Sequence, residues 1–382
     1  MDLSAKQRTI LMVTNNYTPF SGGVVSSLLS TCAELRKHGH RVVVVTFDFL
    51  ANGAQEPDVI RVRCAGRFMY RGNHCVLPWR MGLQLAEIID DLKPDLIHVH
   101  HPFLLGASVA QHARRKKIPL VFTHHTLYED YVHYVPLPHR ITRPITRWLV
   151  RRFCNSVATV IVPGASIARY LAQQDIHHTV VVPSGILPCF IQQSYALKMI
   201  AFDEPVELLS VSRFVPEKSI EFLLEVVARL GSRYHITLIG YGASGAALRA
   251  YAYERLGLSP EQVQFIEHPS KEHMSDWYRR AHLFLFASVT ETQGLVLAEA
   301  MAFGTPVIAR TGPGVVDCIV DGVNGYLVNS VDEMVACIHK ITASENRALY
   351  EAFQREAFAT AQNYYPHKTV QELLNVYTSL LQ

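Results

Sequence analysis

Two carboxylates and a glycine lie close together in the stretch "TETQGLVLAEAMAFGTPVIA", which follows the apolar run "HLFLFAS". Gln293, Gly294 and Leu295 stand at the predicted start of a helix, where backbone N–H groups without intrahelical partners favour phosphate oxygens. Glu291 precedes this start and Glu299 follows it by about two turns, so both can reach the same crevice. Carboxylates do not bind phosphate, but they accept hydrogen bonds from sugar hydroxyls. The alternation predicts a site for a nucleotide sugar, which has a phosphate centre and a polyol at each side.

A pair of cations lies in the stretch "VSRFVPEKSIEFLLEV". Arg213 closes a predicted strand, and Lys218 falls in the first turn of the predicted helix behind Pro216. A lysine in a first turn opposes the helix dipole, so an anion bound between the two cations would make the position favourable. Two spaced positive charges suit a diphosphate. The alternative is a solvated lysine that pairs with Glu217 or Glu221.

Two glycines, Gly22 and Gly23, separate the first predicted strand from the first predicted helix in "NNYTPFSGGVVSSLLS". Glycine permits close backbone approach, and the helix start that follows offers unpaired amides to an anion. An ordinary glycine turn between strand and helix is an equally simple interpretation.

Several histidines end two neighbouring predicted strands, in "DLIHVHHP" and "VFTHHTLYEDYVHYVP". The cluster comprises Asp95, His98, His100, His101, His124 and His125. Side chains that alternate direction at strand ends seldom converge on a metal without a carboxylate partner, and no His-Glu-x-x-His helix is present, so we predict no metal site. We expect core or hydrogen-bonding roles for His98 and His100, and a site role for His125.

A basic segment, "HRITRPITRWLVRRF", spans residues 139–153, and a shorter one, "RRKK", spans residues 114–117. The longer segment places Trp148, Leu149, Val150 and Phe153 beside Arg143, Arg147, Arg151 and Arg152. Helices with such a mixture bind anionic lipid surfaces. The alternative is an ordinary surface helix whose arginines pair with acids.

The elements that position these residues follow a strand-helix-strand rhythm. β-branched runs such as "TILMVT", "RVVVVTF" and "TVIVP" alternate with helical patterns, which indicates parallel sheets buried on both faces. The rhythm is interrupted across residues 184–204 and then resumes. We therefore predict two doubly wound α/β domains, residues 1–187 and 203–365, with a last helix at about 366–382 that packs back on the first. Ligands in such sheets bind beyond the carboxyl ends of the strands.

The composition is that of a two-domain protein. The chain has 382 residues, of which 49% are hydrophobic and 18% charged, enough for two cores. The seven cysteines, without a Cys-x-x-Cys spacing, argue against a disulfide framework and favour a reducing cytoplasm. No signal peptide and no apolar run of about 20 residues is present, so membrane contact would be peripheral. The net charge of +3 does not indicate nucleic acid.

Taken in order, the motifs resemble those of glycosyltransferase family 4. They are "GGV", "DLIHVH", "THHT", "VPSGI", "SRFVPEK", "ETQGLVLAEAMAFGTPVIA" and "DGVNGYLV", and they cover nearly the whole chain. The resemblance implies the GT-B fold, in which two Rossmann-like domains face each other across a deep interdomain cleft. Within the family, "THHTLYEDYVHYVP" and "TETQGL" are most similar to bacterial 1,2-diacylglycerol 3-glucosyltransferases. One departure is "PSGILPCF", which lacks the aspartate that many members have after the isoleucine, and no role is assigned there.

The resemblance implies a role for each motif residue. Gly22 and Gly23 would lie beside the donor diphosphate, which Arg213 and Lys218 would neutralise. Glu291 and the Gln293, Gly294 and Leu295 backbone would engage the donor sugar, Glu299 the ribose hydroxyls, and His125 would lie near the reacting sugar. The expected catalytic residues are thus His125, Glu291, Arg213 and Lys218. Acceptor or membrane contacts are expected from Tyr128, Arg143, Arg147, Trp148, Arg151 and Arg152.

These roles imply a retaining transferase that moves a hexose, glucose from UDP-glucose, to a lipid such as diacylglycerol. No metal or cofactor is expected, and the enzyme would be cytoplasmic and peripherally associated with the inner face of the membrane. Two alternatives stay open: a family 4 enzyme that acts on a soluble sugar, a protein or a phosphoinositide-type acceptor, and a non-catalytic module that binds nucleotide sugars. A nicotinamide-dependent dehydrogenase is disfavoured, because no Gly-x-Gly-x-x-Gly follows the first strand.

Overall fold

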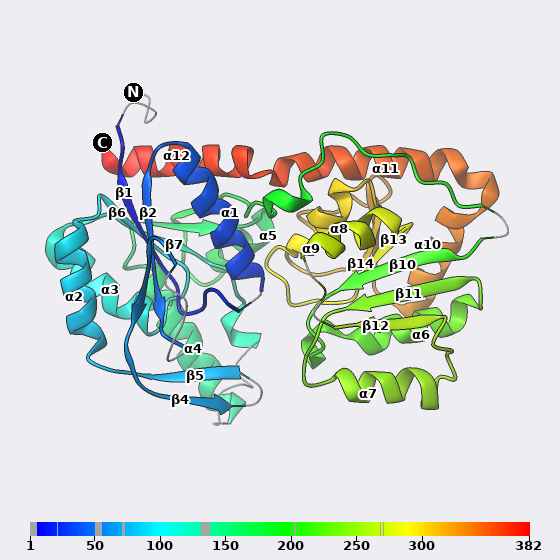
Figure 1. The fold of residues 1–382 in the computed structure, drawn as a ribbon, viewed down its shortest axis with the longest axis horizontal. Coiled ribbons are helices and arrows are strands. Elements are labelled where there is room, and N and C mark those ends of the chain that lie inside the picture. Colours follow the sequence, from blue (N-terminus) through cyan, green and yellow to red (C-terminus); the bar gives the residue numbers. More distant parts are fainter. Residues whose placement is uncertain are drawn as a thin grey trace. The chain divides into compact units, whose positions relative to one another are not determined.

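The structure is a computed structural model that describes residues 6–20, 22–49, 56–70, 73–130, 138–201, 204–267, 269 and 271–382. It divides into two compact units. Unit 1 comprises Met1–Gly185 and Pro366–Gln382, and unit 2 comprises Ile186–Tyr365. Each unit is an α/β layer structure around one parallel sheet (Figure 1). The prediction of two parallel-sheet α/β domains is therefore confirmed.

The sheet of unit 1 has seven strands in the order β3-β2-β1-β6-β7-β8-β9, and every pairing is parallel. The strands are β1 (Thr9–Val13), β2 (Arg41–Phe47), β3 (Val59–Val62), β6 (Leu96–Val99), β7 (Leu120–Thr123), β8 (Thr159–Val162) and β9 (Thr179–Val181). Val and Ile dominate these short runs, as expected for strands buried on both faces. A separate antiparallel hairpin is formed by β4 (Cys64–Tyr70) and β5 (Asn73–Pro78).

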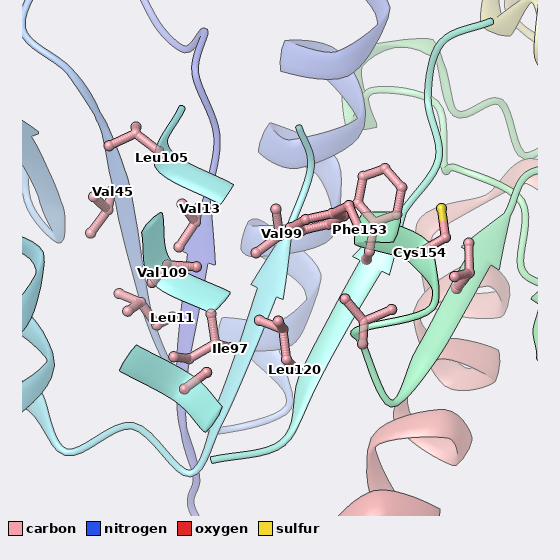
Figure 2. Packing of buried hydrophobic residues seen from close by; sticks show 14 of the residues in the cluster. Leu11, Val13, Val45, Ile97, Val99, Leu105, Val109, Leu120, Phe153 and Cys154 are labelled. Atoms are coloured by element: carbon pink, nitrogen blue, oxygen red, sulfur yellow. The ribbon is translucent and has the colours of Figure 1, made fainter. Parts of the chain in front are cut away.

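Helices cover both faces of this sheet. They are α1 (Gly23–Lys37), α2 (Met81–Leu92), α3 (Leu105–Lys116), α4 (His139–Cys154), α5 (Ala165–Ala172) and α12 (Pro366–Leu381). Successive residues of β1 point to opposite faces, as the period of a strand requires. Leu11 and Val13 join the hydrophobic cluster that includes α3 (Figure 2), and Ile10 and Met12 join the cluster under α1 and α12.

The last helix belongs to unit 1 although the chain reaches it from unit 2. Its residues Val370, Leu373, Leu374 and Tyr377 are buried in the same cluster as Leu28 of α1. Apolar residues at helical spacing thus give α12 one buried face.

The sheet of unit 2 has six parallel strands in the order β12-β11-β10-β13-β14-β15. They are β10 (Val206–Val211), β11 (Tyr234–Ile239), β12 (Val263–Ile266), β13 (Leu283–Phe286), β14 (Val307–Arg310) and β15 (Gly325–Val328). The helices are α6 (Ile220–Leu230), α7 (Gly245–Ala250), α8 (Lys271–Arg280), α9 (Leu295–Ala302), α10 (Val331–Thr342) and α11 (Arg347–Ala361). A five-residue π turn, Tyr251–Arg255, extends α7.

The segment before β10 is fixed to unit 2 by a buried lysine. Lys198 Nζ donates to the carbonyl oxygens of Tyr278 (3.0 Å) and Ala281 (2.7 Å) and to the Thr305 hydroxyl. The Gln354 side chain holds the Lys198 backbone, because its Oε1 accepts from Lys198 N at 2.7 Å and its Nε2 donates to Lys198 O at 3.0 Å. Burial lowers the pKa of the Lys198 ammonium to about 7. The stretch predicted as a connection between domains is therefore part of the unit 2 framework.

All seven cysteines lie within the described residues, and none forms a disulfide. In the part of the chain that the structure describes, no helix is long and apolar enough to cross a bilayer.

Candidate active site

The strand order of each sheet reverses beside the first strand of its unit. In unit 1, β1 lies between β2 and β6, and in unit 2, β10 lies between β11 and β13. The loops that leave neighbouring strands at such a point diverge, and open α/β sheets bind ligands there. In unit 2 this edge carries the loops after β10 and β13, and in unit 1 the loops after β1 and β6. The predicted donor-binding residues other than Glu299 lie in or next to these loops, whereas His125 and Tyr128 follow β7 and the remaining ones lie in α4.

Lys218 and Glu291 form an ion pair at the switch point of unit 2. Lys218 Nζ donates to Glu291 Oε1, and the two side chains are only 10% and 20% exposed. They come from the loops after β10 and β13, whose strands are neighbours in the sheet. The structure thus brings together two residues that are separated by 73 positions in the sequence. A lysine and a carboxylate held side by side can serve adjacent parts of one ligand, an anion and a hydroxyl.

The local structure around Lys218 differs from the prediction. Lys218 ends a 3₁₀ turn, Pro216–Lys218, and Ser219 then adopts a left-handed conformation with φ of 50° before α6 begins at Ile220. The prediction that Lys218 lies in the first turn of the helix is therefore wrong. Pro216 fixes the turn that precedes the helix, and Ser219 separates the two. Lys218 therefore lies before the first turn of α6, and the positive end of the helix dipole acts on it from outside the helix.

Arg213 pairs with Glu217. The Arg213 guanidinium lies 3.4 Å from Glu217 Oε1, and the arginine is half-exposed while the acid is buried. The predicted alternative named Glu217 or Glu221 as the partner of Lys218, and the acid that the structure pairs with Lys218 is Glu291. Arg213 and Lys218 accordingly each have an acid partner.

Two glycine loops that the sequence analysis did not select shape this site. A Cβ on Gly314 would lie 2.3 Å from both Gln293 N and the Thr292 carbonyl carbon, so only glycine permits the approach, and Gly314 N donates to Glu291 O at 2.9 Å. The sequence signal was the Gly-Pro-Gly turn after β14.

The second loop follows β11 and begins "GYG". A Cβ on Gly240 would lie 1.8 Å from Ser212 O, and one on Gly242 would lie 2.3 Å from Phe214 O. Phe214 N also donates to Tyr241 O at 2.8 Å. The loop after β11 therefore lies directly against the backbone on either side of Arg213 and fixes its position.

The start of α9 is as predicted. Gly294 is the N-cap residue in a left-handed conformation (φ 71°), and the helix begins at Leu295. Gln293 is buried beside it. Backbone amides at such a start can receive phosphate oxygens.

Glu299 lies deeper than the sequence suggests. The residue is 7% exposed, and its Oε2 accepts a 2.7 Å hydrogen bond from the Tyr278 hydroxyl of α8. Burial raises the pKa of the Glu299 carboxyl to about 7, while the hydrogen bond from Tyr278 acts in the opposite direction. Its contact with ribose hydroxyls stays a prediction.

In unit 1, Gly22 is the N-cap residue of α1 and Gly23 its first residue. Among the described residues, and apart from the chain neighbours and the helix's own backbone, no heavy atom lies within 4 Å of a Cβ built at either position. Packing against these residues does not require the two glycines, although the φ of 155° at Gly22 favours glycine there, and the open space suits close approach of a ligand to the backbone.

Three histidines form a connected group in unit 1. His100 Nδ1 lies 2.9 Å from His125 Nε2 with the rings stacked, and the His98 and His100 ring centroids are 4.3 Å apart. His98 also contacts the Tyr377 hydroxyl of α12 and the Thr123 hydroxyl, both at 2.6 Å. His124 packs edge-on against Phe122 and Tyr128. The core and hydrogen-bonding roles predicted for His98 and His100 are confirmed.

Asp95 does not belong to this group. It lies at the opposite, amino end of β6, where it accepts hydrogen bonds from Arg8 (2.9 Å) and Thr9 N (2.8 Å). His101 lies at the carboxyl end, where its Nδ1 contacts Asn15 N and the Thr14 hydroxyl at 3.2 Å. The cluster read from the sequence is therefore divided between two edges of the sheet.

The imidazoles at this edge are uncharged near neutral pH. Burial lowers the pKa of His98 to about 3 and of His101 and His124 to about 4, and it lowers the pKa of His100 and His125 well below the usual value. Among the described residues, no group of three or more His, Cys, Asp or Glu side chains could hold a metal ion.

Tyr128 packs edge-on against Phe103 and His124 beside the unit 1 core, with ring centroids 5.3 and 5.5 Å apart. Burial raises the pKa of its phenol. Its proposed contact with an acceptor stays a prediction. The last six residues of the motif "THHTLYEDYVHYVP", 131–136, lie outside the described residues.

Helix α4 combines both predicted characters of the basic segment. Arg143 pairs with Asp130 (3.0 Å), Arg147 with Glu129 (2.6 Å) and Arg151 with Asp175 (2.8 Å). The Arg152 guanidinium lies over the Trp148 ring, 5.5 Å from its centroid. Three arginines thus pair with acids, as the alternative required.

The apolar residues of α4 divide between two faces. Val150 and Phe153 are buried in the unit 1 core, so their prediction as surface contacts is wrong. Phe153 is labelled in Figure 2. The exposed stripe consists instead of Ile141, Ile145, Trp148 and Leu149, which are 39–56% exposed. These positions share one side of the helix because side chains three, four and seven residues apart align.

Comparison with known proteins identifies the class. The profile described as "Glycosyltransferase Family 4" matches residues 21–188, and that described as "Glycosyl transferases group 1" matches residues 205–344. The chain belongs to glycosyltransferase family 4 and is a glycosyltransferase enzyme. The fold agrees: the Anabaena protein HepE in complex with UDP-glucose superposes with a TM-score of 0.74 at 18% identity, over 98% of this chain and 100% of that one.

Two curated relatives are alpha-monoglucosyldiacylglycerol synthases. The Streptococcus pneumoniae protein is 29% identical over 86% of this chain and 76% of its own length. The Acholeplasma laidlawii protein is 27% identical over 91% of both chains.

Proposed function

We propose that this enzyme transfers glucose from UDP-glucose to diacylglycerol, with retention of the anomeric configuration, at an anionic membrane surface. The observation that carries the donor half of the proposal is the Lys218 and Glu291 pair at the switch point of unit 2. The lipid half is supported by the exposed stripe on α4 and by similarity to the two synthases.

The donor groups suit a departing nucleoside diphosphate. Charge develops on the leaving phosphate in the transition state, and positioned cations and helix-start amides stabilise it most effectively when the site excludes water. Lys218 and Arg213 supply the cations, and the Gln293, Gly294 and Leu295 backbone supplies the amides. Because two side-chain cations carry this role, we propose no metal or cofactor.

The sugar hydroxyls are assigned to carboxylates and to the imidazole. Glu291, beside Lys218, accepts hydrogen bonds from the glucosyl group, and Glu299 accepts them from the ribose. Gly22 and Gly23 allow the unit 1 backbone to approach the donor, and neutral His125 contacts the reacting sugar. The acceptor hydroxyl attacks from the face that the diphosphate leaves, which retains the configuration without a covalent intermediate.

The membrane contact is assigned to α4. Trp148 offers an amphipathic ring of the kind enriched at lipid interfaces, with Arg152 stacked on it and Arg143, Arg147 and Arg151 along the same helix. Tyr128 is assigned to the acceptor. The enzyme would act from the cytoplasmic side as a peripheral protein.

A transfer assay tests the proposal. Purified enzyme is incubated with labelled UDP-glucose and vesicles that contain diacylglycerol and an anionic phospholipid. We expect a lipid-extractable product whose anomeric proton identifies an α-glucoside. Absence of any lipid product with UDP, GDP and ADP sugars would overturn the lipid acceptor. Transfer to soluble sugars would then favour the second family 4 alternative, and donor binding without any transfer would favour a non-catalytic module.

A further inference from the structure

The β4–β5 hairpin is an unusual feature of unit 1, because it stands outside the seven-stranded sheet (Figure 1). Its two strands pair antiparallel from Cys64↔Pro78 to Tyr70↔Asn73, with an irregularity between Cys64 and Gly66. A two-stranded hairpin is marginal in water by itself and needs a packed face. What each face contacts therefore decides what the hairpin does.

The register assigns the hairpin residues to two faces. Arg67 and Val76 are partners on the inner face, where Val76 packs on the unit 1 core and Arg67 pairs with Asp48 at 2.5 Å. His74 lies on this face too, with its ring 4.9 Å from that of Phe20. The inner face thus anchors the hairpin to the domain.

The outer face and the chain that follows it are apolar and exposed. Phe68 and Leu77 lie on the outer face, because each follows an inner-face residue, Arg67 or Val76, and successive side chains of a strand point to opposite faces. We name as the hairpin surface Phe68, Leu77, Trp79 and Leu83, which are 48–61% exposed. Trp79 follows β5 directly, with its N–H bonded to Arg63 O, and Leu83 lies in the first turn of α2. A soluble domain rarely exposes so many large apolar side chains on one short segment without a partner.

The charge of the segment indicates the chemistry of that partner. The described residues in this segment, 63–70 and 73–84, include three arginines, Arg63, Arg67 and Arg80, and no aspartate or glutamate, and of these arginines Arg67 pairs with Asp48. The Arg80 guanidinium lies over the Trp79 ring, 5.6 Å from its centroid. Tryptophan with arginine at an apolar edge suits an anionic lipid interface, where the ring lies at headgroup level and the cation meets phosphate.

We propose that the hairpin surface is a second membrane contact of unit 1, separate from α4, and that it inserts into the interface of an anionic bilayer. This inference rests on the proposed function, because it adds an anchor to an enzyme whose acceptor is a lipid. Two contacts would fix the orientation of unit 1 on the membrane surface, whereas contact through α4 alone would leave the unit free to rotate about the axis of that helix. The lipid chemistry recognised is a phosphate headgroup above an acyl boundary.

The three tryptophans of the chain allow a direct test. Trp79 precedes α2, Trp148 is in α4 and Trp277 is in α8 of unit 2, so paired Trp→Phe changes leave one reporter at each place. Vesicles of phosphatidylcholine with phosphatidylglycerol are added to each full-length variant. We expect Trp79 emission to move to shorter wavelength and to be quenched by lipids brominated in the acyl chain, and Trp277 emission to stay unchanged.

Several outcomes would overturn the inference. Unchanged Trp79 emission while the Trp148 reporter responds would leave α4 as the membrane contact and remove the hairpin. A Trp79 shift that grows with protein concentration before vesicles are added would assign the surface to a second copy of the chain. If neither reporter responds, the proposal of membrane binding fails for both the hairpin surface and α4. Transfer to a soluble acceptor would still be measurable, so failure of membrane binding can be distinguished from failure of the transferase activity.

Substitutions give a second measurement. Leu77→Ser with Leu83→Ser should weaken vesicle binding roughly tenfold, because two exposed leucines lose their apolar insertion. Val180→Ser with Val181→Ser is the matched control, since both valines are exposed on β9 of the same unit. Equal binding by the two double variants would contradict the proposal, and thermal melting checks that each is folded.

Discussion

Unit 1 and unit 2 share one plan, a parallel sheet whose strand order reverses beside its first strand, yet they place opposite chemistry at that point. Unit 2 places charged groups there, with Lys218 against Glu291 and Arg213 against Glu217. Unit 1 places uncharged imidazoles there, including His100 and His125. The shared frame therefore does not decide the ligand. The charged edge suits an ionic diphosphate, and the uncharged edge suits a neutral sugar or alcohol.

The largest effect is expected at Lys218, in the charged site of unit 2. We expect Lys218→Ala to lower kcat/KM for UDP-glucose roughly 100- to 1,000-fold, because a positioned cation at a developing negative charge is worth about that much. Lys340→Ala is the control, since this lysine lies over the Tyr326 ring on the surface of the same unit. Steady-state kinetics with thermal melting separates lost catalysis from lost folding. Equal activity of the two variants would remove Lys218 from the site.

Acidification should distinguish the units by stability. The pKa values of His98, His101 and His124 are lowered by burial, so the stability that these neutral imidazoles contribute is complete above about pH 6.5 and is lost as the pH falls. Each of these histidines should lower the free energy of unfolding of unit 1 by about 2 kcal/mol when the pH falls from about 7 to about 5. In the described part of unit 2, His282 acts in the same direction. Glu299 acts in the opposite direction, because its raised pKa favours the folded state on acidification.

Hydrogen exchange measured on peptides of each unit, corrected for the intrinsic pH dependence, checks this expectation. Glu299→Gln serves as the matched variant and should make unit 2 more sensitive to acid relative to the native chain. Equal loss of protection in both units of the native enzyme would contradict the assignment.

A smaller effect is expected at Tyr377. Tyr377→Phe removes the hydroxyl that contacts His98 Nδ1 and leaves a buried polar atom without its partner, which should cost about 1–2 kcal/mol of unfolding free energy. The loss should appear in unit 1, because α12 packs there. Tyr350→Phe, whose hydroxyl donates to His282 O in unit 2, is the comparison. Local exchange protection distinguishes them, and a loss confined to unit 2 in the Tyr377 variant would be inconsistent with this account.

The smallest expected effect concerns the surface charges. Arg143→Ala breaks an exposed pair with Asp130, which should change stability by less than about 0.5 kcal/mol. It should nevertheless weaken binding to anionic vesicles about fivefold, since each arginine near such a surface contributes about 1 kcal/mol. Arg229→Ala removes an equally exposed arginine of unit 2, paired with Asp332, and should leave vesicle binding unchanged. Vesicle sedimentation at low salt measures both, and equal weakening would show that unit 2 also meets the membrane.

The sheets could be predicted because their evidence is local. A run such as "RVVVVTF" is too short and too β-branched for a helix, and its regular return along the chain fixes parallel pairing. The glycine that starts α9 could be found for the same reason. Each of these signals lies within a few residues of the feature that it predicts.

The pairings within the site could not be predicted, because they depend on loops that meet from distant parts of the chain. The partner of Lys218 is Glu291, which lies 73 residues away in the sequence. The need for glycine at position 314 is evident only from its close contact with the Gln293 backbone, which the sequence does not show. On α4, the pattern showed which residues are apolar but not which side packs on the domain, so Val150 was assigned to the wrong face.

The position of α12 has a consequence for how the protein is made. A ribosome releases the first 185 residues long before the last 17, yet the cluster under α1 is closed by Val370, Leu373 and Tyr377. Unit 2 is a continuous stretch and can fold as soon as it emerges, since domains fold as units during synthesis. Unit 1 is therefore begun before unit 2 and completed after it, and until α12 has been synthesised the apolar side chains of α1 lack the helix that covers them.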